Sequence, residues 1–95
     1  MTAYVLAQLS IQDRPRYDRY AARFLPTLKP FDGRLLAADE GPQVLEGEWS
    51  REKVVLIAFP DRERALAWAA SPAYQAISAD RVAATDGTVL VIQGF

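Results

Sequence analysis

Hydrophobic and polar residues alternate along residues 3–11, which is the period of a β-strand whose two faces differ. Residues 53–59 behave differently, because the run VVLIAF at positions 54–59 is apolar at every position. An unbroken apolar run of this length is typical of a strand that is covered on both faces. Residues 88–93, TVLVIQ, predict another strand with apolar side chains on both sides.

Two shorter strands are predicted between the first strand and the apolar run. Residues 34–39 and 43–46 are rich in strand-forming residues, and Glu40-Gly41-Pro42 between them has the composition of a turn. We therefore expect a short hairpin with a polar tip.

Spacings of three and four residues predict a first helical segment after the first strand. It begins at Asp13, a candidate N-cap followed by an early proline, Pro15. Its apolar face consists of Tyr17, Tyr20, Ala21, Phe24 and Leu28. Pro26 and Pro30 predict a break or a second short helix before the turn at Asp32-Gly33.

A second helical segment follows the apolar strand and begins at Asp61, another candidate cap. Its apolar face consists of Ala65, Leu66, Trp68 and Ala69. Ser71-Pro72 is expected to end this helix and to start a further one. The stripe of that further helix consists of Tyr74, Ile77, Ser78 and Arg81. Asp86-Gly87 is expected to close it as a turn before the last strand.

The order of these elements predicts an α+β fold over a single domain, residues 1–95. Two crossover units joined through antiparallel strands give a ferredoxin-like βαββαβ sandwich, with an antiparallel sheet and helices on one face. The alternative is a small open α/β sheet with helices on both faces. In the preferred fold the second apolar face of the sheet has no cover, so we expect it to pack against a second copy of the chain.

Composition excludes several classes of function. The chain has no cysteine and no histidine, so disulfides, thiol nucleophiles, thiolate metal sites and histidine acid–base chemistry are absent, and no metal or cofactor is expected. The formal net charge of −1 argues against a nucleic-acid partner. No signal peptide or membrane span is evident, which predicts a cytoplasmic protein without a membrane partner.

Charged residues near the predicted turns are candidates for a ligand site. Arg34 follows a turn, and its guanidinium could bind a carboxylate or an enolate. Glu46 could pair with Arg34 across the hairpin, or act as a base when buried. Arg81 shares its helical stripe with Tyr74, where it would extend to solvent, hold a carboxylate, or contact an anion in a cavity.

Aromatic residues complete the set of candidates. The hydroxyl groups of Tyr17, Tyr20 and Tyr74 could line a cavity, or could be core groups bonded to the backbone. Trp49, in an irregular connection, could roof a pocket or fill a dimer interface. The ligand-binding candidates are thus Arg34, Glu46, Tyr20, Tyr74, Arg81 and Trp49.

Three segments together resemble a known family: GRLLAADEGPQVLEGEW, VVLIAFPDRERALAWAASPAYQAI, and Arg81 followed by TVLVIQG. They are similar to the domain of unknown function 1330 family, whose members belong to the dimeric α+β barrel superfamily. The resemblance implies this barrel fold and a homodimer. It departs at two turns, since the chain has Asp32-Gly33-Arg34 where the family often has Gly-Gly-Arg, and inserts Arg14 between Asp13 and Pro15.

Three kinds of function follow. The expected one is a homodimeric protein that binds a small anionic or apolar metabolite in a cavity of the barrel. The first alternative is an enzyme similar to the cofactor-independent monooxygenases or isomerases of this superfamily, which rests on analogy of fold. The second is a purely structural dimer.

Overall fold

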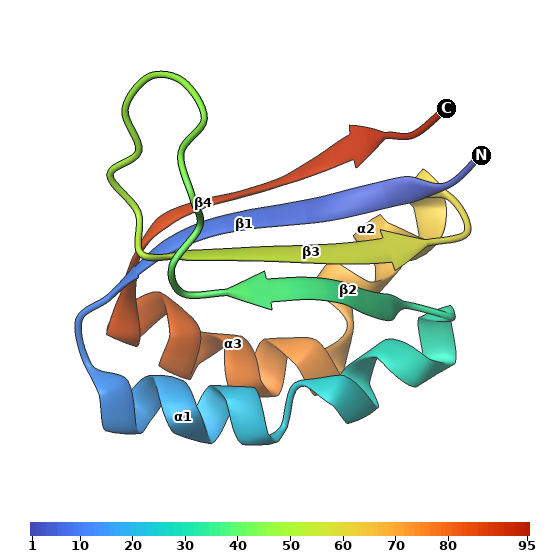
Figure 1. The fold of residues 1–95 in the computed structure, drawn as a ribbon. Coiled ribbons are helices and arrows are strands. Elements are labelled where there is room, and N and C mark those ends of the chain that lie inside the picture. The colour runs from blue at the N-terminus through green and yellow to red at the C-terminus, as the bar shows by residue number, and fades with distance from the viewer.

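One antiparallel sheet and a layer of helices make up the computed structural model, which describes residues 1–95 (Figure 1). In chain order the elements are β1 (Ala3–Ile11), α1 (Arg14–Ala22), the 3-10 helix η1 (Leu25–Phe31), β2 (Arg34–Asp39), β3 (Lys53–Phe59), α2 (Arg62–Ala70), α3 (Pro72–Ala84) and β4 (Thr85–Gln93). The strands lie in the order β2-β3-β1-β4, and every neighbouring pair is antiparallel. This is the predicted α+β ferredoxin-like fold, and the alternative with helices on both faces is wrong.

The helices begin where the capping residues predict. Asp13 and Asp61 each accept a hydrogen bond from the backbone N–H three residues later, at 3.2 Å and 2.8 Å. Ser71 caps α3 in the same way, with its Oγ 3.3 Å from the backbone nitrogen of Tyr74. Pro26 and Pro30 both fall within η1. The chain therefore has a separate short helix after α1, which ends at Ala22, and this is one of the two outcomes that the prolines predicted.

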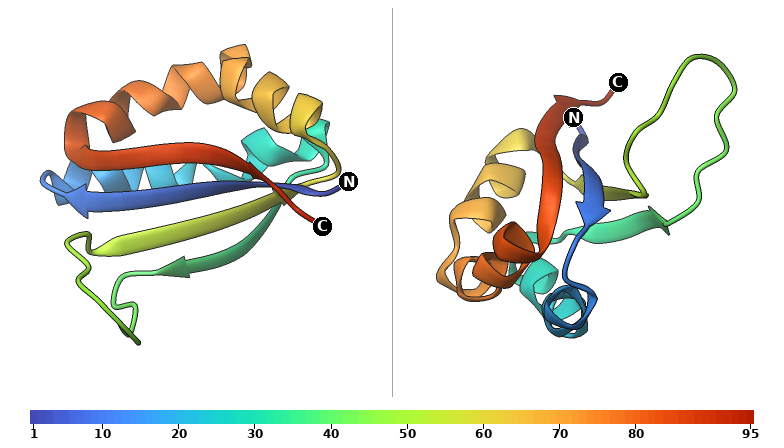
Figure 2. Two further views of the ribbon diagram at one scale, coloured as in Figure 1. Left: turned by 90° about the horizontal axis from the view of Figure 1, so that it is seen from above. Right: turned by 90° about the vertical axis from the view of Figure 1, so that its left-hand side faces the viewer.

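Residues 43–46 do not form the predicted strand. They lie in a long loop, residues 40–52, that extends from the sheet on the side away from the helices (Figures 1 and 2). The strand that pairs with β2 is β3, whose ladder to β2 ends with Asp39 opposite Val54, so the loop has no strand to pair with. Strand-forming side chains alone do not make a strand without a hydrogen-bonding neighbour.

Asp86-Gly87 is not a turn, because β4 already begins at Thr85 and both residues pair with β1. The reason for the glycine is steric. A Cβ at position 87 would stand 1.9 Å from the backbone oxygen of Gln8. Glycine here therefore permits a close approach of two strands, which is one of the known uses of glycine inside a sheet.

The core lies between the helices and one face of the sheet. The alternating residues of β1 that point toward the helices, Ala3, Val5, Ala7 and Leu9, are all buried. From β3 the same face receives Val55, Ile57 and Phe59. Five aromatic residues from the helical layer belong to the same core, namely Tyr17, Tyr20, Trp68 and Tyr74 from the α-helices and Phe24 from the connection between α1 and η1.

The opposite face of the sheet has no helix over it (Figure 2). Leu6 pairs across this face with Leu56 on β3 and with Leu90 on β4. Leu90 and Ile92 keep 39% and 41% of their surface exposed. None of the helices has the length and apolar character needed to cross a membrane.

Candidate functional site

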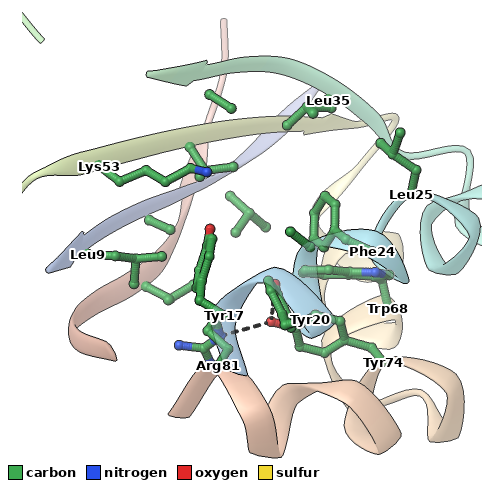
Figure 3. A pocket seen from close by; sticks show the side chains of 16 residues that line it. Leu9, Tyr17, Tyr20, Phe24, Leu25, Leu35, Lys53, Trp68, Tyr74 and Arg81 are labelled. Atoms are coloured by element: carbon green, nitrogen blue, oxygen red, sulfur yellow. Dashed lines mark hydrogen bonds between the residues drawn. The ribbon is translucent and has the colours of Figure 1, made fainter. Parts of the chain in front are cut away.

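A cavity of about 180 Å³ lies between the helical layer and the sheet (Figure 3). Strands β1, β2, β3 and β4 form one wall, and α1, η1, α2 and α3 form the other. The lining residues are Val5, Ala7, Leu9, Tyr17, Tyr20, Ala21, Phe24, Leu25, Leu35, Ala38, Lys53, Val55, Trp68, Tyr74, Arg81 and Val89. Leu25 and Leu35 are exposed, so the cavity opens to solvent beside them.

One set of polar side chains in this cavity forms a chain of hydrogen bonds from α3 to α1. The Nε–H of Arg81 donates to the hydroxyl of Tyr74 at 3.2 Å, and the hydroxyls of Tyr74 and Tyr20 share a hydrogen bond at 3.1 Å. Burial raises the pKa of Tyr20 well above its ordinary value, with the neighbouring Tyr74 adding to the effect. Tyr20 is therefore a neutral hydrogen-bonding group and not a base.

A second polar group lies where β3 faces α1. The ammonium of Lys53 is 4.9 Å from the ring centroid of Tyr17, a cation–π contact. Figure 3 shows the two side chains extending toward each other, Lys53 from the start of β3 and Tyr17 from α1. Tyr17 is only 3% exposed, yet no side chain or backbone group is hydrogen-bonded to its hydroxyl.

Lys53 belongs to an ionic group that connects α1 to the ends of β2 and β3. The carboxylate of Glu40 accepts two hydrogen bonds from the guanidinium of Arg14, one from Nη1 at 3.2 Å and one from Nη2 at 2.5 Å. The other carboxylate contact of Glu40 is with the Lys53 ammonium at 3.6 Å. The Arg14 hydrogen bonds lower the pKa of Glu40, so this carboxylate stays ionised.

Charge is distributed unevenly around the cavity. Lys53 and Arg81 are the charged residues in its lining, and no aspartate or glutamate is among them. Arg81 forms no ion pair, because its partner is the neutral Tyr74 hydroxyl. An apolar space bounded by two cations favours a ligand with a negative charge, since opposite charges attract more strongly away from water.

The structure brings three of the six predicted residues together, since Tyr20, Tyr74 and Arg81 all line the cavity. Glu46 and Trp49 lie elsewhere, in an open groove on the 40–52 loop. Arg34 is exposed at the first position of β2 and lines neither space.

The predicted pairing of Arg34 with Glu46 does not occur. It required a hairpin that would place residues 43–46 beside β2, and that hairpin is absent.

Lys53 is the site residue that sequence reasoning missed. It is the first residue of an apolar strand, and its position two residues before Val55 places it on the same face of β3 as the core residues. That alternation was a usable signal, but a terminal lysine normally extends into solvent. The structure assembles no group of three side chains suited to holding a metal ion.

The fold is similar to solved structures of low sequence identity. A protein of unknown function from Rhodopseudomonas palustris has a TM-score of 0.82 at 14% identity, over 99% of this chain and 82% of that one. For a dimeric ferredoxin-like protein of unknown function from Jannaschia sp. CCS1 the TM-score is 0.70 at 22% identity, over 99% and 100% of the two chains. For the cofactor-independent oxygenase SnoaB from Streptomyces nogalater it is 0.66 at 11% identity, over 99% and 93%.

These structural similarities establish the fold alone. No curated protein matches the sequence. The family predicted from the three sequence segments is confirmed by a match over nearly the whole chain. With residues 2–95 matching the family described as Domain of unknown function (DUF1330), the chain belongs to that family.

Proposed function

We propose that the protein binds a small, largely apolar molecule with one anionic oxygen in the cavity between helices and sheet. The observation that carries the proposal is the lining, in which Lys53 and Arg81 are the charged residues of an otherwise mainly hydrophobic wall. A carboxylate, phenolate or enolate would gain from these cations, and an aromatic or acyl body would fill the apolar part.

The size of the cavity limits the ligand. Its volume is about 180 Å³. Apolar protein cavities of about 150 Å³ admit benzene, whereas sites for drug-sized molecules span about 300–1,000 Å³. The proposed ligand is therefore a single substituted ring or a short acyl chain.

Binding can be followed through Trp68, which lines the cavity. The second tryptophan, Trp49, lies on the 40–52 loop, so a Trp49→Phe variant leaves Trp68 as the fluorescent reporter. We expect the fluorescence emission of Trp68 to change as benzoate is added and to reach saturation. Benzamide, a neutral molecule of the same shape, should bind more weakly.

A blocking variant is the matched control for binding inside the cavity. Ala38 is exposed and lines the cavity from β2, so Ala38→Phe adds bulk there without entering the core and without adding a tryptophan. Benzoate binding should be lost in the double variant Trp49→Phe/Ala38→Phe. Equal affinity for benzoate and benzamide, or unchanged binding in the blocked variant, would contradict the proposal.

The protein is further proposed to act as a homodimer of single-domain chains. The uncovered sheet face supports this, because Leu6, Leu56 and Leu90 form an apolar row with nothing over it in one chain. The similar proteins from Jannaschia sp. and Thermobifida fusca are described as dimeric ferredoxin-like proteins. Light scattering on a size-exclusion peak should give twice the mass of 10.6 kDa, and a single-chain mass at micromolar concentration would refute the dimer.

An enzymatic role is the second candidate. SnoaB, which has a similar fold, is described as a cofactor-independent oxygenase. In this chain the favouring observation is again the pair of cations, which would stabilise an electron-rich phenolate or enolate. Oxygen consumption with single-ring quinols tests this role, and a rate equal to that of the buffer would leave binding without chemistry.

A further inference from the structure

We infer that Lys53 and Tyr17 form the end of the cavity that recognises the anionic oxygen of the ligand. In this arrangement the Tyr17 hydroxyl donates a hydrogen bond to that oxygen, and the Lys53 ammonium supplies the charge. The inference rests on the proposed binding function and assigns its specificity to two residues that a strand and a helix bring together.

The hydroxyl of Tyr17 is a hydrogen-bonding group of the cavity that has no protein partner. Every fully buried side-chain nitrogen or oxygen in the structure has a hydrogen-bond partner. The Tyr17 hydroxyl has none although the residue is 3% exposed, so the open space next to this hydroxyl is the cavity that the residue lines. A ligand oxygen that enters the cavity can therefore accept a hydrogen bond from this hydroxyl without displacing a protein partner.

At the other end of the cavity the Nε–H of Arg81 and the two tyrosine hydroxyls already have partners. Arg81 donates its Nε–H to Tyr74, and Tyr74 in turn shares a hydrogen bond with Tyr20. A ligand oxygen that approached Nε or either hydroxyl would have to compete with these contacts, which leaves it only the Nη groups of Arg81. At the Lys53 end it would replace no hydrogen bond.

The charge of Lys53 is only partly balanced. Its one carboxylate neighbour, Glu40, lies 3.6 Å away and is held through two hydrogen bonds by Arg14. Arg14 also approaches Asp18 at 3.9 Å, but the Asp18 side chain is 62% exposed and that contact is screened by solvent. The Lys53 side chain itself is only 13% exposed, so its remaining charge acts mainly on the cavity.

Visible absorbance of 4-nitrophenol tests the inference, because this phenol ionises near neutral pH and its phenolate form is yellow. Titration with saturating protein should show the pKa of the bound phenol lowered by about one unit, as expected for an anion beside a cation. Lys53→Met should abolish this lowering. Tyr17→Phe should weaken binding of the phenolate while leaving the affinity for nitrobenzene, a neutral analogue, unchanged.

Two further variants separate the local effect from general charge. Lys29→Met removes an exposed lysine by the same substitution and should leave the lowering intact. Glu40→Gln removes the carboxylate beside Lys53 and should lower the pKa of the bound phenol further, because the ammonium then has no competing anion. Glu40 is exposed, so this variant is expected to fold even if Lys53→Met does not.

The outcomes distinguish this inference from the proposed function. If wild-type protein binds no nitrophenol or leaves its pKa unchanged, both fail. If the pKa is lowered but Lys53→Met and Glu40→Gln leave the lowering as it was, the ligand is anionic but Lys53 does not recognise it. A lowering that Arg81→Met abolishes and Lys53→Met retains would place the anion at the opposite end and overturn the inference.

Discussion

The two faces of the sheet are nearly equally apolar at their centre, but they differ in what covers them. On the helix side, Val5 of β1 lies between Ile57 and Val91. One residue further along, Leu6 lies between Leu56 and Leu90 on the open side. Hydrophobicity along the strands therefore shows that both faces need cover. It does not show which of the two faces the helices of the same chain cover.

Polar groups separate the faces more clearly than apolar ones do. The helix side contains the Tyr20–Tyr74–Arg81 chain and the contact of Lys53 with Tyr17, all around the cavity. The open side has only strand side chains and the neighbouring 40–52 loop (Figure 2). A face with an internal cavity and oriented polar groups suits a ligand, whereas a broad apolar face suits a second protein surface.

The largest expected effect is from Ile57→Asp, because Ile57 is 2% exposed in the core. The substitution leaves a buried carboxylate without a partner and should lower the free energy of unfolding by about 4 kcal/mol or more. Urea unfolding followed by circular dichroism measures this loss. If the variant is unfolded in water, Ile57→Ala should still show a loss of about 2–5 kcal/mol. A wild-type midpoint would mean that this face is not the core.

Leu56→Asp, at the adjacent residue on the same strand, should have a different effect. Leu56 is on the open side, so its carboxylate stays hydrated in one chain but would be buried in the proposed dimer. We expect a folded protein with a dissociation constant raised by about 100-fold, equivalent to about 2.7 kcal/mol of association free energy. Analytical ultracentrifugation over a range of concentrations measures it. Undiminished dimerisation would show that the interface lies elsewhere.

The smallest effect is from Tyr20→Phe, and its sign depends on pH. Near neutral pH the variant should lose about 1 kcal/mol, the usual contribution of one hydrogen bond. The raised pKa of Tyr20 keeps it protonated when folded, whereas unfolded tyrosine ionises near pH 10, so its stabilising effect is present below about pH 10 and is lost as the pH rises above it.

Urea titrations at about pH 8 and about pH 11 test this sign. Wild-type protein should lose more stability between the two than Tyr20→Phe does, by about 1.4 kcal/mol for each pH unit above the unfolded pKa. Parallel losses in the two proteins would contradict the burial of an un-ionised Tyr20.

Local patterns were sufficient for most elements of the fold. Asp13, Asp61 and Ser71 mark helix starts correctly because capping is decided by hydrogen bonds within a few residues. The alternation in β1 and the apolar run in β3 locate two strands for the same reason, since period reflects local geometry. The predictions of a strand at residues 43–46 and of a turn at Gly87 were wrong, because both depend on whether a partner strand is present. Strand β1 pairs with β4 at Gly87, whereas the loop has no partner strand.

The site itself shows the limit of the sequence. Periodicity placed Tyr20, Tyr74 and Arg81 on inward helix faces, and the structure joins them because α1 and α3 pack side by side. Arg14 and Tyr17 come from α1, whereas Glu40 and Lys53 come from the ends of β2 and β3, and no spacing along the chain predicts that the helix meets these strand ends. The sequence by itself determined the elements, their order and the apolar character of both sheet faces. Only the tertiary structure decided which face the helices cover and which charges surround the cavity, because contacts between distant segments depend on how whole elements pack.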